Sequence, residues 1–203
     1  MSPIFPFCYS ESQKIIVELG IGNGQLLKKL LEVNKNTCPS ATNEKTPLYV
    51  GIEVNSSEYN KAKLSLQSFT NVILINGSFE QLINDFPDGS IDEIISILPH
   101  PDFMDVEKQD HWKKFYRIMN RKMSTQGRFR LVAELIDDLL QPVSEEIYNI
   151  WIHWVINTFE DMGFSLVRIV GGSPAEYESQ CLERFNGDPE RIRLATFDFI
   201  KRG

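Results

Sequence analysis

The chain has 203 residues, of which 42% are hydrophobic, and it carries a net charge of −7. This length and composition predict one domain spanning residues 1–203, with a short arm at 1–13. Three widely separated cysteines form no metal-binding pair and leave an odd count, so neither a disulfide framework nor a metal site is expected. The start of the sequence does not resemble a signal peptide, and no apolar run is long enough to cross a bilayer, which favours a cytoplasmic protein.

The first informative pattern is a glycine-rich turn between a strand and a helix. An apolar run at 15–19 precedes glycines at positions 20, 22 and 24, and a helix-period run follows at 25–31. Glycines leave the backbone of a turn open, so a ligand can lie against it. Glu18 would repel a phosphate, and the last glycine comes one residue too early for a dinucleotide fingerprint. The pattern therefore favours a ligand that carries a positive charge.

A second strand is predicted at 48–54, after a polar segment at 34–47 that reads as a surface loop. The strand includes Glu53 near its end, where dinucleotide-type folds hydrogen-bond ribose hydroxyls. Ser56 or Ser57 can cap a following helix that runs to about Phe69. Glu53 is thus the candidate ribose ligand.

In this acid-x-Gly-x-Gly-x-Gly motif and in the acidic second strand, the chain resembles the class I S-adenosylmethionine-dependent methyltransferases. The resemblance implies that S-adenosyl-L-methionine is the cofactor. It implies that Gly20, Gly22 and Gly24 face this cofactor, with Glu18 near its methionine ammonium and Glu53 at its ribose.

The third strand, predicted at 72–75, is followed by a segment that the resemblance places at the adenine. It implies a polar contact from Ser78 or its neighbour Gly77, and packing of Phe79 on the ring. Local turn chemistry explains Asn76-Gly77 equally well. Val54 and Leu98, near the ends of the second and fourth strands, complete the expected cofactor contacts.

The fourth strand, predicted at 91–98, runs into Pro99-His100-Pro101-Asp102. Prolines at a strand end fix the direction in which the chain leaves the sheet. In an open parallel sheet this edge lines the ligand crevice. Pro99 and Pro101 are therefore candidates for contact with a substrate.

A helix is predicted at 109–123, with one apolar stripe and one basic face that includes Lys113, Lys114 and Arg117. Between residues 107 and 130 there are eight basic residues against two acidic ones. Such a face can orient a polyanion on an acidic body, and it equally fits an ordinary solvated helix.

A strand is predicted at 127–134, a long helix at 144–162, and two further strands at 164–170 and 193–200. The helix should bury one stripe of apolar side chains: Ile147, Ile150, Trp151, Trp154, Val155, Thr158, Phe159 and Met162. Strands and helices alternate until two strands follow without a helix. This order predicts an α/β fold, a Rossmann-like doubly wound sheet of seven mostly parallel strands with a reversed last strand.

Four segments resemble the tRNA (guanine-N7)-methyltransferase family: 51–54, the proline-flanked turn at 99–102, the strand at 127–134, and 175–178 followed by Gly187 and Arg193. The family has P-D-P-W where this chain has Pro-His-Pro-Asp, and T-D where it has Ala133-Glu134. Its T-x-Y-E motif is Ala-Glu-Tyr-Glu here. The family's basic N-terminal arm is essentially missing.

The resemblance implies tRNA as the partner and guanine N7 as the methyl acceptor. A carboxylate can hold the guanine N1–H and amino edge, and Glu134, Asp102 and Glu178 are the acids that remain for this. His100 stands at the family's aspartate position but accepts only one such bond. It is included among the catalytic candidates with Glu134 and Asp102, although it fits a turn residue as well. Tyr177 and Glu178 are expected to bind substrate, together with the two prolines and the three basic residues of the helix.

Two alternatives stay open from the sequence. The acidic surface and the missing arm also suit an enzyme that methylates a small molecule or another RNA position. The lost acid and hydroxyl groups suit a cofactor-binding partner protein without turnover.

Overall fold

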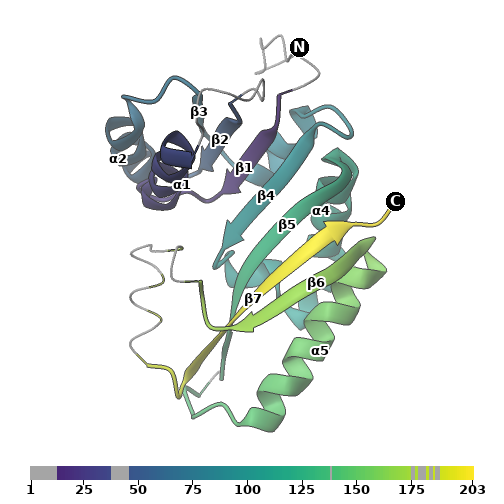
Figure 1. Cartoon of the computed structure of the whole chain (residues 1–203). Coiled ribbons are helices and arrows are strands. Elements are labelled where there is room, and N and C mark those ends of the chain that lie inside the picture. Colours follow the sequence, from purple (N-terminus) through teal and green to yellow (C-terminus); the bar gives the residue numbers. More distant parts are fainter. Residues whose placement is uncertain are drawn as a thin grey trace.

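The computed structural model describes residues 13–37, 46–137, 139–174, 177, 182, 185 and 188–203. Within these residues seven strands form one sheet in the order β3-β2-β1-β4-β5-β7-β6 (Figure 1). The strands are β1 (Ile15–Leu19), β2 (Leu48–Glu53), β3 (Val72–Asn76), β4 (Ile91–Ile97), β5 (Met123–Ile136), β6 (Phe164–Gly171) and β7 (Ile192–Lys201).

The strand directions confirm the predicted fold class. β1 to β5 are mutually parallel, whereas β7 is antiparallel to both of its neighbours, β5 and β6. The six parallel strands therefore end on one side of the sheet, which we call the carboxyl edge. Ligands of open α/β sheets bind at this edge, where the strand order reverses between β1 and β4.

Helices cover both faces of the sheet, as predicted. The α-helices are α1 (Gln25–Thr37), α2 (Ser56–Leu66), α3 (Phe79–Leu82), α4 (Gln109–Lys122) and α5 (Glu145–Asp161), and the short 3₁₀ helices are η1 (Ile83–Asp85), η2 (Pro101–Phe103) and η3 (Val106–Lys108). Buried side chains of α1 and α2 join one core cluster, and those of α4 and α5 join the other. In Figure 1, α1 and α2 accordingly lie beside β1 to β3, while α5 runs along β6.

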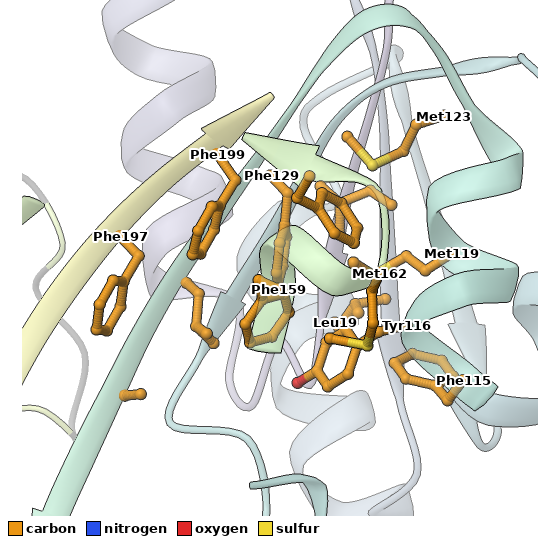
Figure 2. Close-up of a cluster of buried hydrophobic side chains, with 14 of the residues drawn as sticks. Leu19, Phe115, Tyr116, Met119, Met123, Phe129, Phe159, Met162, Phe197 and Phe199 are labelled. Carbon is orange, nitrogen blue, oxygen red and sulfur yellow. The ribbon is translucent and has the colours of Figure 1, made fainter. Parts of the chain in front are cut away.

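The larger core cluster contains a group of aromatic rings between the sheet and helices α4 and α5 (Figure 2). Phe159 of α5 lies 4.8 Å from Tyr116 of α4 and 5.0 Å from Phe199 of β7, measured between ring centroids. Such ring pairs contribute more than their buried area alone. They attach α5 to α4 and to β7.

Three local predictions differ from the structure. Helix α1 extends to Thr37, four residues into the segment predicted as a loop at 34–47, and Asn34 in its last turns hydrogen-bonds the Tyr49 hydroxyl. The N-cap of α2 is Asn55 and not Ser56 or Ser57, because its side-chain oxygen accepts from two backbone N–H groups at the start of the helix. Residues 38–45 and the arm up to residue 12 lie outside the described residues.

Helix α5 buries the C-terminal half of the predicted stripe, from Val155 to Met162, but not its first two residues. Tyr148 and Ile152 are buried, whereas Ile147 and Ile150 are exposed. The buried residues of the helix follow the line from Tyr148 to Phe159, and Ile147 and Ile150 lie outside this line. Apolar spacing alone defines a broad stripe, and the packing partner decides its centre. Among the described residues, no helix combines the length and the apolar character needed to cross a bilayer.

Candidate functional site

The glycine-rich turn between β1 and α1 has the backbone conformation that only glycine adopts readily. Gly20, Gly22 and Gly24 have φ angles of +70°, +53° and +78°. The Gly20 N–H donates to the Ile52 carbonyl at 2.9 Å, and the Gly22 N–H donates to Oε2 of Glu53 at 2.8 Å. The turn after β1 is therefore fixed against the end of β2.

The three glycines do not share one environment. A Cβ atom at Gly20 or Gly22 would meet no other atom within 4 Å, so both positions border open space. At Gly24 a Cβ would lie 3.0 Å from Leu66 Cδ1 and 3.2 Å from Ala62 Cβ. The packing of α1 against α2 explains the glycine at position 24, and its expected contact with a cofactor stays a prediction. Gly20 and Gly22 form the open part of the turn.

Glu18 is buried beneath this turn at the end of β1. Burial, reinforced by the nearby charge of Glu53, raises the pKa of Glu18 to about 8. Its Oε2 atom is buried without a hydrogen-bond partner among the described residues. A buried carboxylate oxygen without a donor is costly, and a ligand with a cationic N–H group would remove that cost.

Glu53 ends β2 and holds the backbone around the turn. Besides the bond from Gly22, its Oε1 accepts from the Asn55 N–H at 2.7 Å. Each of these oxygens keeps a second lone pair, so a hydroxyl donor can still bind. Val54 beside it is 68% exposed. Glu53 can therefore accept hydrogen bonds from a ligand with hydroxyl groups, and Val54 can contact an apolar part of the same ligand.

The end of β3 lies beside Glu53 and is held by a residue that the sequence did not single out. Asn76 Nδ2 donates to the Glu53 carbonyl at 2.7 Å, and the Gly77 N–H donates to the same oxygen at 2.9 Å. Ser78 is the N-cap of α3, but its side chain makes no capping bond. The position of an asparagine at the carboxyl end of a strand is the signal that could have identified Asn76.

Phe79 is half-buried, and its surroundings differ from the expectation. Its ring lies 5.0 Å from Phe103 and 5.3 Å from Phe115, measured between centroids. The three rings pack against the core face that α4 covers. Phe79 thus has a packing role that accounts for it without a cofactor ring.

The chain leaves β4 through a constrained backbone. Leu98 has a φ of +49°, an uncommon value for a residue with a side chain, and its N–H donates to the Val132 carbonyl at 2.8 Å. Pro101 then starts the 3₁₀ helix η2. Strained residues cluster at ligand edges. Leu98 and Pro99 follow β4 at the carboxyl edge, and their contacts with a cofactor and a substrate stay predictions.

His100 and Asp102 form a turn of their own. The Asp102 N–H donates to His100 Nδ1 at 3.3 Å, and Asp102 also pairs with Lys108. The hydrogen bond from Lys108 holds the pKa of Asp102 below its usual range. Both side chains are exposed. His100 is thus the N-cap of η2, and Asp102 lies within this helix with its carboxylate paired to Lys108, an arrangement that accounts for both without a catalytic role.

Glu134, near the end of β5, is the other acid whose environment is unusual. Burial raises its pKa to about 7, and its Oε2 atom has no hydrogen-bond partner among the described residues. It lies two residues beyond Val132, which accepts the bond from Leu98. Two unpaired buried carboxylate oxygens, on Glu18 and Glu134, therefore occur at the same edge of the sheet.

The basic face predicted around α4 is partly neutralised. Lys122 is buried and pairs with Asp88 at 2.8 Å, and Arg121 pairs with the same carboxylate at 3.3 Å. Lys114 and Arg117 are exposed, whereas Lys113 is half-buried beside the Trp112 ring. Helix α4 begins near the carboxyl edge and runs away from it, and the contact of Lys113, Lys114 and Arg117 with a substrate stays a prediction.

Tyr177, expected to bind substrate, is buried among the residues that pack against α1. Its hydroxyl accepts a hydrogen bond of 2.7 Å from Nη1 of Arg130. Arg130 also pairs with Glu93 and with Asp198, each at 3.4 Å. Tyr177 therefore anchors the connection between β6 and β7 on the sheet. Glu178 lies outside the described residues.

Comparison with known proteins gives relatives of moderate similarity. No family model matches the chain. The bifunctional methyltransferase of Rickettsia prowazekii (strain Madrid E) is 26% identical over 130 residues, which is 62% of this chain and 23% of that protein. The corresponding protein of Rickettsia felis is 27% identical over 129 residues. The matched region thus spans about a quarter of the length of these curated relatives.

Solved structures share the fold over nearly the whole chain. The 16S rRNA methyltransferase KamB superposes with a TM-score of 0.68 at 14% identity, covering 95% of this chain and 90% of KamB. Phosphoethanolamine N-methyltransferase 2 of Haemonchus contortus has a TM-score of 0.63 at 11% identity, covering 97% of this chain and 50% of that one. The [4+2]-cyclase SpnF also matches, with a TM-score of 0.60 at 12% identity, over 95% of this chain and 76% of SpnF. The strand order, the reversed β7 and these likenesses together show that the chain has the class I methyltransferase fold.

Proposed function

We propose that the protein is an S-adenosylmethionine-dependent methyltransferase that acts on guanine N7 in tRNA. The observation that carries the first part is Glu18, whose buried Oε2 atom has no donor among the described residues and lies beneath two glycines that border open space. The names of the curated relatives, all bifunctional methyltransferases, support the same chemistry. Because one fold hosts several activities, as SpnF illustrates, the site residues must carry the argument.

The residues present fit the cofactor. Glu18 would hold the methionine ammonium, because the ammonium supplies both a donor for Oε2 and a charge that offsets burial. Gly20 and Gly22 would leave room for the cofactor backbone. Glu53 would take the ribose hydroxyls with its remaining lone pairs, and exposed Val54 would contact the adenine. When bound, the cofactor supplies an electrophilic methyl group on a sulfonium sulfur.

Glu134 is the residue that we propose binds the guanine base. The N7 atom has a free lone pair, so the protein must chiefly orient the base and exclude water. A carboxylate can accept hydrogen bonds from guanine N1–H and from its amino group, and it stabilises the positive charge that the ring gains on methylation. Glu134 is partly buried, unpaired and close to the Leu98 turn. The sequence similarities at 51–54 and 127–134 support the same family of substrates.

The test is transfer of labelled methyl from S-adenosylmethionine to unmodified bulk tRNA, followed by digestion and identification of the nucleosides by mass. We expect 7-methylguanosine from the native protein and a large loss of it with Glu134→Gln. The control, Glu146→Gln, makes the same chemical change at an exposed position of α5 and should retain activity. Cofactor binding without any labelled nucleoside would refute the tRNA assignment.

One observation favours a second candidate, a methyltransferase for a small molecule. Lys108, Arg121 and Lys122 are paired with acids and so are less available to a nucleic-acid backbone. A small-molecule enzyme would be indifferent to heparin, whereas a tRNA enzyme would be inhibited by it. Heparin competition at constant ionic strength therefore separates the two candidates.

A further inference from the structure

A cavity of about 200 Å³ opens at the carboxyl edge beyond Glu134, between β7, the end of β6 and the first turns of α5. Leu194 of its lining pairs directly with Glu134 across the β5–β7 ladder, and Arg193 pairs with Leu135. The cavity is thus one strand away from the acid proposed to hold the methyl acceptor. It is separate from the glycine turn, which lies on the other side of β4.

The walls of this cavity are preformed. Gly171 and Gly172 contribute backbone without side chains, and the Gly172 N–H donates to the Leu194 carbonyl at 2.7 Å. Thr196 Oγ1 donates to the Gly172 carbonyl at 2.8 Å, which fixes the same wall from the other side. Phe185 and Ile192 supply apolar surface. This lining suits the flat body of an aromatic ring better than a fully hydrated ion.

Arg193 gives the cavity a cation that is held in place. Its guanidinium carbon lies 4.2 Å from the centroid of the Tyr148 ring, and the Tyr148 hydroxyl donates to the Leu194 carbonyl at 2.7 Å. A guanidinium has five N–H donors. Within the described residues its one ion pair joins Nη2 to Oε1 of Glu145 at 2.8 Å. The remaining donors are oriented by the tyrosine and have no other protein acceptor in that part of the chain.

Glu145 is a partner that an anion can displace. Its side chain is 74% exposed, whereas that of Arg193 is 24% exposed. Exposed ion pairs contribute little stability, so releasing Glu145 to water has a small cost. A phosphate would form shorter, charge-assisted and bidentate bonds with the same guanidinium.

We infer that this cavity is a subsite for a nucleotide, with a base against the glycine and apolar walls and its phosphate on Arg193. The inference rests on the proposed function, in which a guanine near Glu134 belongs to RNA and has neighbouring nucleotides. Arg193 lies on the α5 face of the sheet and Glu134 on the α1 face, so a nucleotide next to the methylated one would reach this cavity by passing over the carboxyl edge. The subsite would let an acidic protein bind RNA through one fixed cation instead of a broad basic surface.

Separate substitutions of Arg193 and Glu145, the two partners of the ion pair, test the inference. Arg193→Met keeps the length of the side chain and removes its charge, and it should weaken tRNA binding about tenfold or more, the range for lost charge-assisted contacts. Glu145→Gln should strengthen tRNA binding, because it frees the guanidinium. Binding is measured by titration at fixed ionic strength, with thermal unfolding as the check of folding. Effects of the same sign, or no effect of either variant, would show that the pair is only structural and would overturn the inference.

A second set of titrations separates the subsite from the proposed activity and identifies the source of the phosphate. Guanosine 5′-monophosphate, guanosine and inorganic phosphate are titrated into the native protein and into Arg193→Met without cofactor. We expect the monophosphate to bind more tightly than either fragment and to lose that advantage in the variant. Such binding together with absent tRNA affinity would assign the site to free nucleotides. Normal tRNA methylation with equal binding of all three compounds to both proteins would leave the activity standing and refute the subsite.

Discussion

Glu18 couples the candidate cofactor site to pH. In the folded protein its pKa is about 8, whereas the unfolded chain releases the proton near the ordinary value of 4.5. The contribution of this group to stability is therefore fully present below pH 4.5 and is lost as the pH rises through 8. We expect the free energy of unfolding to fall by up to about 1.4 kcal/mol per pH unit within this window. Denaturant titrations from pH 5 to 8 should show a flatter profile for Glu18→Gln than for Glu146→Gln.

The same group predicts proton release when the cofactor binds. An ammonium beside Glu18 favours its charged form, so the proton held at pH 7 must leave on binding. The affinity for S-adenosylmethionine should therefore increase from pH 6 to pH 8. Calorimetry in two buffers with different ionisation enthalpies measures the released proton directly. A pH-independent affinity in the native protein would contradict the placement of the ammonium at Glu18.

Glu134 should set the pH dependence of the reaction. Burial raises its pKa to about 7, and the proposed contact with guanine requires the charged form. We expect kcat/KM for tRNA to increase as the pH rises through 7, and this increase should disappear in Glu134→Gln. A rate that falls over the same range would mean that the protonated acid is the active form.

At the scale of elements, the glycine turn must leave open space for a ligand and must also let α1 pack against α2. The sequence motif does not show which glycine meets which requirement. Gly20 and Gly22 border open space, and Gly24 is packed against α2. The motif predicted an open turn because alternate glycines after a buried strand have few other uses. It could not show which glycine touches α2, since this depends on Ala62 and Leu66 from a helix almost forty residues later in the chain.

Gly22→Ala should reduce cofactor affinity far more than it reduces stability. Its φ of +53° costs an alanine about 1–2 kcal/mol, and the added methyl group projects into the candidate site. Gly89→Ala is the matched control, because Gly89 has a φ of +73° and open space but lies in the turn before β4. Both variants should lower the melting temperature similarly, and only Gly22→Ala should weaken binding measured by calorimetry. Equal binding by both would refute a cofactor at the turn.

At the carboxyl edge, the local sequence predicts the secondary structure but not the role of each side chain. The strands, their acids and the proline-bounded exit from β4 follow from spacing and composition, and the structure agrees with each of them. The roles of individual side chains there depend on partners distant in sequence. Asp102 is occupied by Lys108, and Tyr177 by Arg130, whose contact spans 47 positions. Hence the position of the site was predictable, but not which of its acids remain unpaired.

For the whole molecule, the stability that an apolar residue of α5 contributes depends on whether its side chain is buried or exposed. Phe159 is fully buried among rings from α4, β5 and β7 (Figure 2). Ile150, in contrast, is 63% exposed. Phe159→Ala should cost about 3–5 kcal/mol, and Ile150→Ala should stay within about 0.5 kcal/mol of the native protein. Urea unfolding followed by tryptophan fluorescence measures both. A large loss with Ile150→Ala would mean that this face of α5 is covered in solution.

The place of β7 in the sheet has a consequence for how the chain folds during synthesis. β7 follows β6 in the sequence, yet it lies between β5 and β6, and among the described residues β6 pairs with β7 alone. A nascent chain that stops before Ile192 therefore leaves both β5 and β6 with open hydrogen-bonding edges. Such edges invite pairing with other chains. Completion of the fold is thus delayed until translation has passed the final strand, and chaperone binding should be greatest in the interval between the emergence of β6 and that of β7.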